Sequence, residues 1–280
     1  MADGVRTDIH DSLGGVPGPV ELRRRRPPPD LSAFCSGITF YRERFQGVAR
    51  QLETATLTVP LIVSFGTPFE IGLGRPPGPE DRIRSFVAGP YAGPVHILSR
   101  GEAHCLQIDF TPLGARRVFG LPMDELTGRM VLIDDLDDAG VRTLADRLTD
   151  TPDWSRRFDI AERFVIERLG LAAPPVPEIA WAFAALDASH GSARIAALSA
   201  DLGWSRRHFI SRFRTEIGMS PKTVARLLRF AHAQRIARST GTAWADTAAA
   251  AGYADQAHLI RDFREFSGLT PQAWLRTQPR

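Results

Sequence analysis

Hydrophobic positions recur at a helical spacing over residues 193–218. Ile195, Leu198 and Leu202 are three or four residues apart, so they share one face of a predicted helix. Gly203 follows, and glycine tolerates the left-handed backbone that commonly ends a helix. The pattern therefore predicts a short amphipathic helix that stops at a tight turn.

A second helix is predicted directly after this turn. Ser205 provides its N-cap, because a serine hydroxyl can accept a hydrogen bond from a free backbone N–H of the first turn. Its apolar residues fall on one side and its arginines and a small polar residue on another: Phe209, Phe213 and Ile217 against Arg207, Ser211 and Arg214. A helix held by aromatic residues, with arginines on its free side and a glycine turn before it, is typical of a helix-turn-helix DNA reader.

The same pattern returns 50 residues later. Asp255 takes the N-cap position of Ser205, and the downstream residues match in register. The matched pairs include His208 with His258, Ile210 with Ile260, Phe213 with Phe263, Arg214 with Arg264, and Gly218 with Gly268. Self-similarity at a fixed offset indicates a repeated structural unit. We therefore expect two helix-turn-helix units, joined by a long helix that begins at Pro221.

Between Leu31 and Phe110 the pattern changes to short β-rich runs separated by Gly, Pro and charged clusters. The runs are LTVPLIVSFG, FEIGLG, IRSFVAGP, VHILSR and HCLQIDF. The last run alternates as a half-buried strand does, with Leu106, Ile108 and Phe110 against Cys105, Gln107 and Asp109. Many short strands at regular spacing predict a β barrel or sandwich.

Helical patterns follow the strands. LGARRVFG is a predicted short helix, and MDELTGRMVLIDDL after it is a predicted turn-rich connection. AGVRTLADRLTD and DWSRRFDIAERFVIERLG are predicted amphipathic helices. The proline-stiffened AAPPVP marks a domain boundary. We expect an α+β chain with a disordered or extended arm at 1–30, rich in Gly, Pro and charge. A mainly β regulatory, effector or dimerisation domain with trailing helices would span 31–173, and an all-α DNA-binding domain would span 174–280.

The charge distribution supports this division. The net charge is +3, with 14 Arg and Lys against 8 Asp and Glu from Pro177 onward, and 21 against 24 before it. The positive excess coincides with the repeated motif, as expected for binding to a polyanion. The N-terminus lacks the apolar segment of a secretory signal and no apolar run is long enough to cross a bilayer, so we expect a cytoplasmic location and no membrane partner. Cys35 and Cys105 fit a reducing compartment, and buried free thiols are favoured over a disulfide.

The C-terminal residues resemble the AraC/XylS family of transcription regulators. GYADQAHLIRDFREFSGLTPQAWLR is similar to that family's second-unit signature, and the resemblance covers about residues 177–276. SFVAGP, QIDFTPLGARRVFGLPMDEL and LIDDL are similar to the regulatory domain of a subgroup. The resemblance implies seven helices, with two recognition helices held on one face by the connecting helix. One monomer would then read two successive major grooves, which lie roughly 34 Å apart.

The resemblance also assigns the base-reading positions. They are Arg206, Arg207, Ile210 and Ser211 in the recognition helix 205–217, and Gln256, Ala257, Ile260 and Arg261 in the recognition helix 255–267. Arg214 and Arg264 lie further along each helix, so we expect them to contact phosphate. Family members often have a long polar residue where this chain has Ser211, and we therefore expect Arg207 to carry the direct readout of the first unit.

An enzyme or a metal-binding β barrel in the N-terminal half is the main alternative. Its candidate ligands are Glu70, His96, His104, Cys105 and Asp109, which we interpret as unrelated strand residues. His104 and Asp109 point to opposite faces of one strand, so they cannot hold one ion. The sequence has no nucleophile elbow, phosphate loop or C-x-x-C pair. An architectural DNA binder without a ligand is a second alternative.

The expected function is therefore a sequence-specific DNA-binding transcription regulator without catalytic residues, metal or cofactor. Double-stranded DNA is the expected partner, with a small-molecule effector, RNA polymerase and a second copy of the chain as further candidate partners. Residues that would bind an effector cannot be read from unaligned strands.

Overall fold

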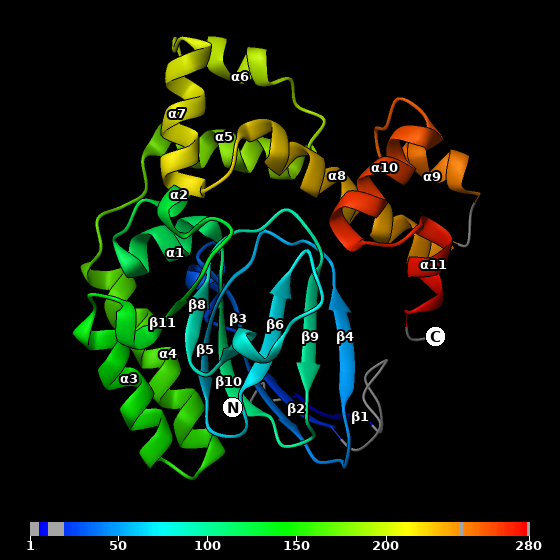
Figure 1. The fold of residues 1–280 in the computed structure, drawn as a ribbon. Coiled ribbons are helices and arrows are strands. Elements are labelled where there is room, and N and C mark those ends of the chain that lie inside the picture. Colours follow the sequence, from blue (N-terminus) through cyan, green and yellow to red (C-terminus); the bar gives the residue numbers. More distant parts are fainter. Residues whose placement is uncertain (1–5, 11–19, 241–242, 279–280) are drawn as a thin grey trace.

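The computed structural model describes residues 6–10, 20–240 and 243–278. The N-terminal half has three layers: helices, a large sheet and a small sheet (Figure 1). The C-terminal half is helical and lies across one end of the two sheets (Figure 1). The α+β class is as predicted.

Two antiparallel sheets build the N-terminal half, with strand orders β1-β2-β3-β10-β5-β8-β11 and β4-β9-β6-β7. The strands of the larger sheet are β1 (Arg6–His10), β2 (Val20–Arg25), β3 (Cys35–Glu43), β5 (Val59–Ser64), β8 (Phe86–Ala88), β10 (His104–Phe110) and β11 (Met130–Leu132). Those of the smaller sheet are β4 (Ala49–Glu53), β6 (Phe69–Leu73), β7 (Arg82–Ile83) and β9 (Val95–Ser99). The described strands form two open sheets and no closed barrel, so the sandwich-like arrangement is the one observed.

Strand β10 lies inside the larger sheet, between β3 and β5. Its side chains divide between two buried faces: Leu106, Ile108 and Phe110 pack in the core with the helices, and Cys105, Gln107 and Asp109 face a cavity between the sheets. The predicted alternation is confirmed. The prediction that one face meets solvent is wrong, because the smaller sheet covers that face.

The helical layer packs on the larger sheet through apolar faces. It contains α1 (Pro112–Phe119), α2 (Met123–Leu126), α3 (Ala139–Asp150) and α4 (Trp154–Leu171). Side chains of Thr111, Asp138 and Asp153 cap the N-termini of α1, α3 and α4. The predicted helices are confirmed, whereas the predicted turn-rich connection also holds α2 and β11.

Part of the predicted disordered or extended arm at 1–30 is extended. Residues 6–10 and 20–25 form β1 and β2, and β2 pairs with β3. Arg25 lies 2.6 Å from Asp159 of α4 and over the ring of Phe158. The arginine run is thus joined to the sheet by backbone pairing and to the helical layer by one of its side chains. Residues 1–5 and 11–19 of the predicted arm lie outside the described part.

Seven helices make up the described C-terminal half, the number that the family resemblance implies. They are α5 (Pro177–Ala188), α6 (Ile195–Asp201), α7 (Arg206–Ile217), α8 (Pro221–Thr240), α9 (Trp244–Ala250), α10 (Gln256–Ser267) and α11 (Pro271–Arg276). The pairs α6–α7 and α9–α10 are the two predicted helix-turn-helix units. They lie at opposite ends of α8 (Figure 1).

The two halves contact each other at the C-terminal ends of both recognition helices. The Ala55 N–H donates to the Phe266 carbonyl of α10 at 2.8 Å. The Thr127 hydroxyl donates to the carbonyl of Gly218, the C-cap of α7, at 2.7 Å. Arg116 Nε of α1 lies 3.3 Å from Glu216 Oε2 of α7. The N-terminal half therefore satisfies backbone carbonyls that a helix end leaves without an intrahelical partner.

Both cysteines are buried free thiols, as predicted. Burial raises the pKa of Cys35 to about 11 and that of Cys105 to about 12, so both are protonated at neutral pH. In the described part of the chain, no helix combines the length and the apolar character needed to cross a bilayer.

Candidate nucleic-acid interface

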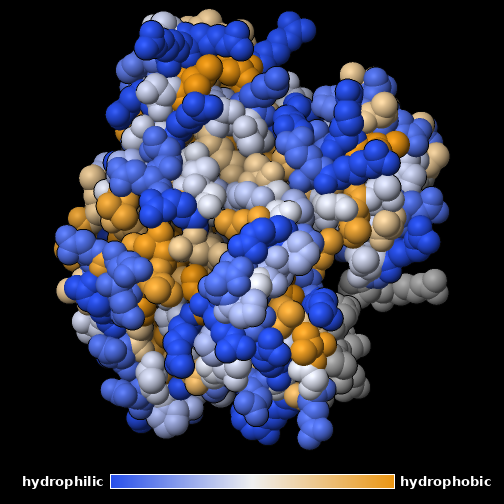
Figure 2. Space-filling model, viewed as in Figure 1, coloured by the Kyte–Doolittle hydropathy of each residue, from blue (hydrophilic) through white to orange (hydrophobic). Residues whose placement is uncertain are grey.

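The residues predicted to read DNA from α7 lie together in one open groove. Its lining consists of Arg206, Arg207, Ile210, Ser211, Arg214 and, from α2, Asp124. Phe209 and Phe213 on the opposite side of α7 are fully buried, which fixes the rotation of the helix about its axis. Three of the five α7 residues are arginines, so the groove has a positive wall. Figure 2 shows hydrophilic residues gathered over this end of the molecule, where Figure 1 places α6 and α7.

The matching residues of α10 are also presented outward. Gln256, Ala257, Arg261 and Arg264 are exposed, and Ile260 is half-buried. Leu259, Phe263 and Phe266 are fully buried on the other side of the helix. The 50-residue repeat thus produces two helices with the same buried face and the same free face.

The N-terminal ends of both recognition helices are built alike. The Ser205 hydroxyl accepts a hydrogen bond from the His208 N–H at 3.2 Å, and the Asp255 carboxylate accepts one from the His258 N–H at 2.6 Å. Both predicted N-caps are therefore confirmed. The positive end of each helix dipole is also presented here, and this end favours a nearby anion such as phosphate.

The second unit is tied to the connecting helix by an ion-pair cluster. Arg226 of α8 donates to Asp262 of α10 at 2.7 Å and to Glu265 at 2.9 Å, and its guanidinium lies over the ring of Phe266. Asp262 is 1% exposed. A buried carboxylate needs such a partner, because an unpaired buried charge is strongly destabilising. The cluster therefore fixes α10 on α8.

The length of α8 suits two adjacent grooves. Its 20 residues, at 1.5 Å each, span about 30 Å. One turn of B-DNA, which separates successive major-groove sites on one face, is about 34 Å. With one unit near each end of α8, this helix is long enough to hold the two units at a separation of that order.

The candidate metal ligands of the alternative hypothesis are dispersed. Glu70 and His96 are on the smaller sheet, and neither lines the cavity between the sheets. Arg82 Nε and Arg100 Nη2 lie 3.0 and 2.9 Å from Glu70 Oε1 and hold the pKa of that carboxyl below its usual range. Cys105 and Asp109 face the cavity, whereas His104 packs against Trp154 on the opposite side of β10. The structure does not bring these five residues to one point.

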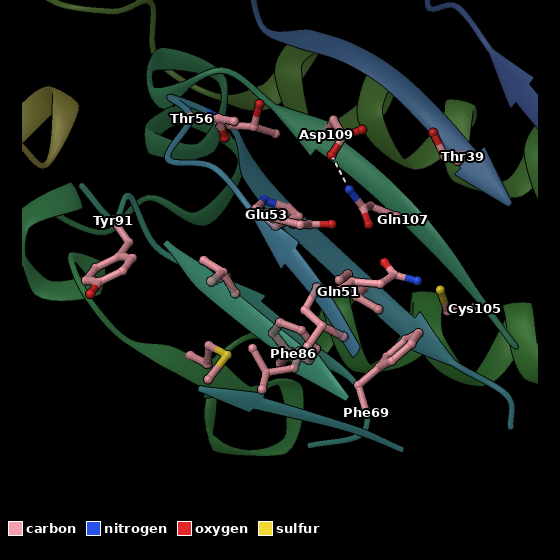
Figure 3. Close-up of a pocket in the computed structure, with 18 of the residues that line it drawn as sticks. Thr39, Gln51, Glu53, Thr56, Phe69, Phe86, Tyr91, Cys105, Gln107 and Asp109 are labelled. Carbon is pink, nitrogen blue, oxygen red and sulfur yellow. Dashed lines mark hydrogen bonds between the residues drawn. The ribbon is translucent and has the colours of Figure 1, made fainter. Parts of the chain in front are cut away.

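A cavity of about 350 Å³ lies between the two sheets. Its size falls within the range of small-molecule sites. One part is apolar and is lined by Ile62, Phe69, Ile71, Phe86, Val95, Ile97 and Met130. Another part is polar and is lined by Arg24, Thr39, Gln51, Glu53, Gln107 and Asp109. Figure 3 shows Glu53, Gln107 and Asp109 close together on one side of the cavity, with Phe69 and Phe86 on the other.

Two carboxyl groups in the polar part of the cavity, those of Glu53 and Asp109, have few hydrogen-bond donors or cations near them. Gln107 Nε2 donates to Asp109 at 2.6 Å, and Asp109 is 5% exposed. Burial raises the pKa of Asp109, although Gln107 and Arg24 act in the opposite direction. Surrounding protein also raises the pKa of Glu53, and the nearby Asp109 adds to the effect. Glu53 is nevertheless an exposed residue, and it lines the cavity.

The sequence did not predict that Asp124 lines the groove on α7, or that Gln51 and Glu53 line the cavity between the sheets. Asp124 lies in a segment that was expected to be a turn-rich connection, and its place beside α7 depends on how the two halves pack. Gln51 and Glu53 lie on β4, whose sequence ARQLE has no alternation that would have predicted a strand. The alternation of Cys105, Gln107 and Asp109 was the available signal for a polar face of β10.

Comparison with known proteins identifies the C-terminal residues. Residues 198–277 match the family described as "Helix-turn-helix domain". The chain is similar in structure to ToxT from Vibrio cholerae, with 10% identity over 87% of this chain and 99% of that one and a TM-score of 0.46. It is also similar to the C-terminal domain of AraT, a response regulator from Geobacillus stearothermophilus, with 19% identity over 39% and 91% of the two chains and a TM-score of 0.36. The AraC-like transcriptional activator CuxR has 12% identity over 84% and 86% and a TM-score of 0.33. No curated protein matches the chain.

Proposed function

We propose that this chain is a sequence-specific transcription regulator that reads two successive major grooves. The proposal proceeds from residues 198–277, which form a helix-turn-helix domain of the AraC type. The observation that best supports this proposal is the groove on α7, where all five predicted DNA-contacting residues of the first unit lie together. The matching exposed residues of α10 extend the same arrangement to a second site.

The proposal divides the arginines into two classes. Arg207 and Arg261 lie on the free faces of α7 and α10 and are assigned to base edges, because an arginine can hold O6 and N7 of guanine through two hydrogen bonds. Arg214 and Arg264 lie further toward the C-terminal ends and are assigned to phosphate. Arg206, Ile210, Ser211, Gln256, Ala257 and Ile260 complete the proposed base-reading surfaces. Phosphate contacts would position the protein without specifying sequence.

A binding-site selection with the full chain tests this function. The chain is mixed with a random duplex library at two salt concentrations, and the retained sequences are aligned. The expected result is a bipartite site whose halves are centred about 10 base pairs apart. Affinity should fall steeply with salt, because phosphate binding releases counterions. If the retained duplexes showed no sequence preference, the chain would be an architectural DNA binder and the proposed sequence-specific function would be wrong.

We assign a regulatory and not a catalytic role to the N-terminal half. The observation that favours a small-molecule effector is the cavity between the sheets, which is closed on one side by the larger sheet and on the other by the smaller one. Self-association is less favoured, because the apolar faces of α3 and α4 already pack in the core with the larger sheet. Contact with RNA polymerase, a homodimer and a cytoplasmic location stay predictions of this proposal.

A further inference from the structure

The cavity between the sheets contains more negative charge than its own residues compensate. Glu53 and Asp109 both face it, and Arg24 is the cationic residue in its lining. No ion pair joins Arg24 to either carboxylate among the described residues, although Arg24 acts on Asp109 from a distance. Two carboxylates against one guanidinium leave one negative charge without a counter-charge.

The polar groups of this cavity also have unused hydrogen-bonding capacity. In the described part of the chain no residue donates a hydrogen bond to the Glu53 carboxylate, and Gln107 is the described donor to that of Asp109. The Thr39 hydroxyl is buried without any hydrogen-bond partner among these residues. Buried polar groups are normally satisfied, so the unpartnered Thr39 hydroxyl and the buried Asp109, beside the exposed Glu53 carboxylate, point to a ligand that supplies donors.

The register of the larger sheet explains why these groups face one space. Arg24, Thr39, Gln107, Ile62 and Phe86 lie in one row across β2, β3, β10, β5 and β8. Side chains in such a row point to the same face of the sheet. The row runs from polar to apolar across the sheet, so a ligand lying along it would meet charge at one end and aromatic surface at the other.

We propose that this cavity binds a small organic cation, in which an ammonium or amidinium group lies between Glu53 and Asp109 and an apolar body lies against Phe69, Ile71 and Phe86. An anion at the same place would meet two carboxylates, and a purely apolar molecule would leave them without a partner. The cation supplies both the donors and the charge that the polar end lacks.

The same site is joined directly to the second recognition helix. Glu53 ends β4, and the next two residues are Thr54 and Ala55. The Ala55 N–H bonds to the Phe266 carbonyl at the end of α10, and Gln234 of α8 donates to the Thr54 hydroxyl at 3.5 Å. A ligand that moves Glu53 toward Asp109 therefore moves the segment that holds α10. The inferred ligand is in this sense the effector of the proposed regulator, and this part of the inference depends on the proposed function.

Three probes of matched size and different charge test the inference on the full chain. They are phenethylamine, 2-phenylethanol and 3-phenylpropionate, and binding is measured by calorimetry. The expected order is amine first, alcohol much weaker and carboxylate weakest. In Glu53→Gln and Asp109→Asn, amine affinity should fall by about 30-fold or more, the usual loss when one partner of a buried charge pair is removed. Alcohol affinity should change little in both variants. Glu102→Gln, which removes an exposed carboxylate from outside the cavity, is the control and should bind as wild type does.

The contrary outcomes are equally clear. Equal or tighter binding of 3-phenylpropionate, or of 2-phenylethanol, would overturn the cationic assignment in favour of an anionic or neutral ligand. An amine preference that persists in both variants would overturn the assignment to Glu53 and Asp109. Failure of phenethylamine to bind the wild-type chain at millimolar concentration would overturn the site. Duplex binding is measured on the same samples without probe, so loss of the proposed function is seen separately from loss of the ligand site.

Discussion

The backbone N–H of Ala55 donates a 2.8 Å hydrogen bond to the carbonyl oxygen of Phe266. Ala55 belongs to the segment that follows β4, and Phe266 to the last turn of the second recognition helix. The Thr127 hydroxyl donates a hydrogen bond to the carbonyl of Gly218 at the end of the first recognition helix. The N-terminal half thus contacts both recognition helices at their C-terminal ends, and the first residues of both helices are exposed.

Removing the Thr127 hydroxyl should loosen the contact at the end of the first recognition helix. Thr127→Val keeps the side-chain shape but deletes the donor to the Gly218 and Met123 carbonyls. We expect the free energy of unfolding to fall by about 1 kcal/mol, because one carbonyl between the halves loses its partner. Amides of α7 should also exchange faster with deuterium. Thr143→Val deletes a bond within α3 and is the control. Unchanged exchange in α7 would show that this contact does not hold the helix.

The isolated fragment 177–280 should fold and bind duplex DNA, because it contains both units and α8. It should be less stable than in the full chain, since Ala55 and Leu113 of the N-terminal half contribute to its hydrophobic core. Fluorescence anisotropy with a labelled duplex at several salt concentrations measures the binding. A fragment that is folded by circular dichroism but shows no salt-sensitive binding would contradict the proposed DNA-binding role.

Arg207→Ala and Arg261→Ala should each relax the base preference at one half of a bipartite site. The expected loss of discrimination is about 1–3 kcal/mol at one base pair, the worth of a bidentate contact to guanine. Arg264→Ala is the matched comparison and should weaken all sequences equally, with a salt slope lower by about one unit. Selection on each variant decides between these outcomes. Uniform loss of affinity in all three variants would mean that the arginines only supply charge.

Asp124→Asn should strengthen DNA binding by a few-fold at low salt. The exposed carboxylate of Asp124 shares the groove with Arg206, Arg207 and Arg214, so it opposes the approach of phosphate. The gain should shrink as salt screens the charges. Asp134→Asn, on an exposed position away from the groove, is the control. Equal gains from both substitutions would indicate a net-charge effect with no role for the groove.

The pH dependence of stability should change in Glu53→Gln. The surrounding protein and the nearby Asp109 raise the pKa of Glu53 in the folded state, although its side chain stays exposed at the cavity. The folded state then holds its proton to higher pH than the unfolded state, so this group destabilises the fold as pH rises above about 4. Glu53→Gln should therefore be more stable than wild type at neutral pH, with a smaller difference near pH 4. Urea unfolding at both pH values measures this, with Glu102→Gln as control. A difference in unfolding free energy between Glu53→Gln and wild type that does not change with pH would contradict the raised pKa of Glu53.

Much of the DNA-binding half could be read from the sequence, because its signals are local. Helical periodicity, a capping residue and a glycine turn act over a few residues, and the 50-residue repeat gave two independent copies of them. The buried Phe209 and Phe213 and the exposed Arg207 follow from that periodicity alone. The pairing of the arm could not be predicted, for the opposite reason: Val20–Arg25 becomes a strand by pairing with β3, and a polar, arginine-rich stretch carries no local sign of that pairing.

The tertiary structure alone decided which distant residues meet. Glu53 and Asp109 are on strands of different sheets, and they face one cavity only because the smaller sheet packs over the larger one. Asp124 enters the DNA-binding groove only because α2 packs beside α7. Residue spacing determines which face of a helix or strand a side chain occupies, whereas the packing of separate elements determines what that face meets. The sequence therefore determined how each recognition helix is built, and the packing decided how the regulatory half is connected to it.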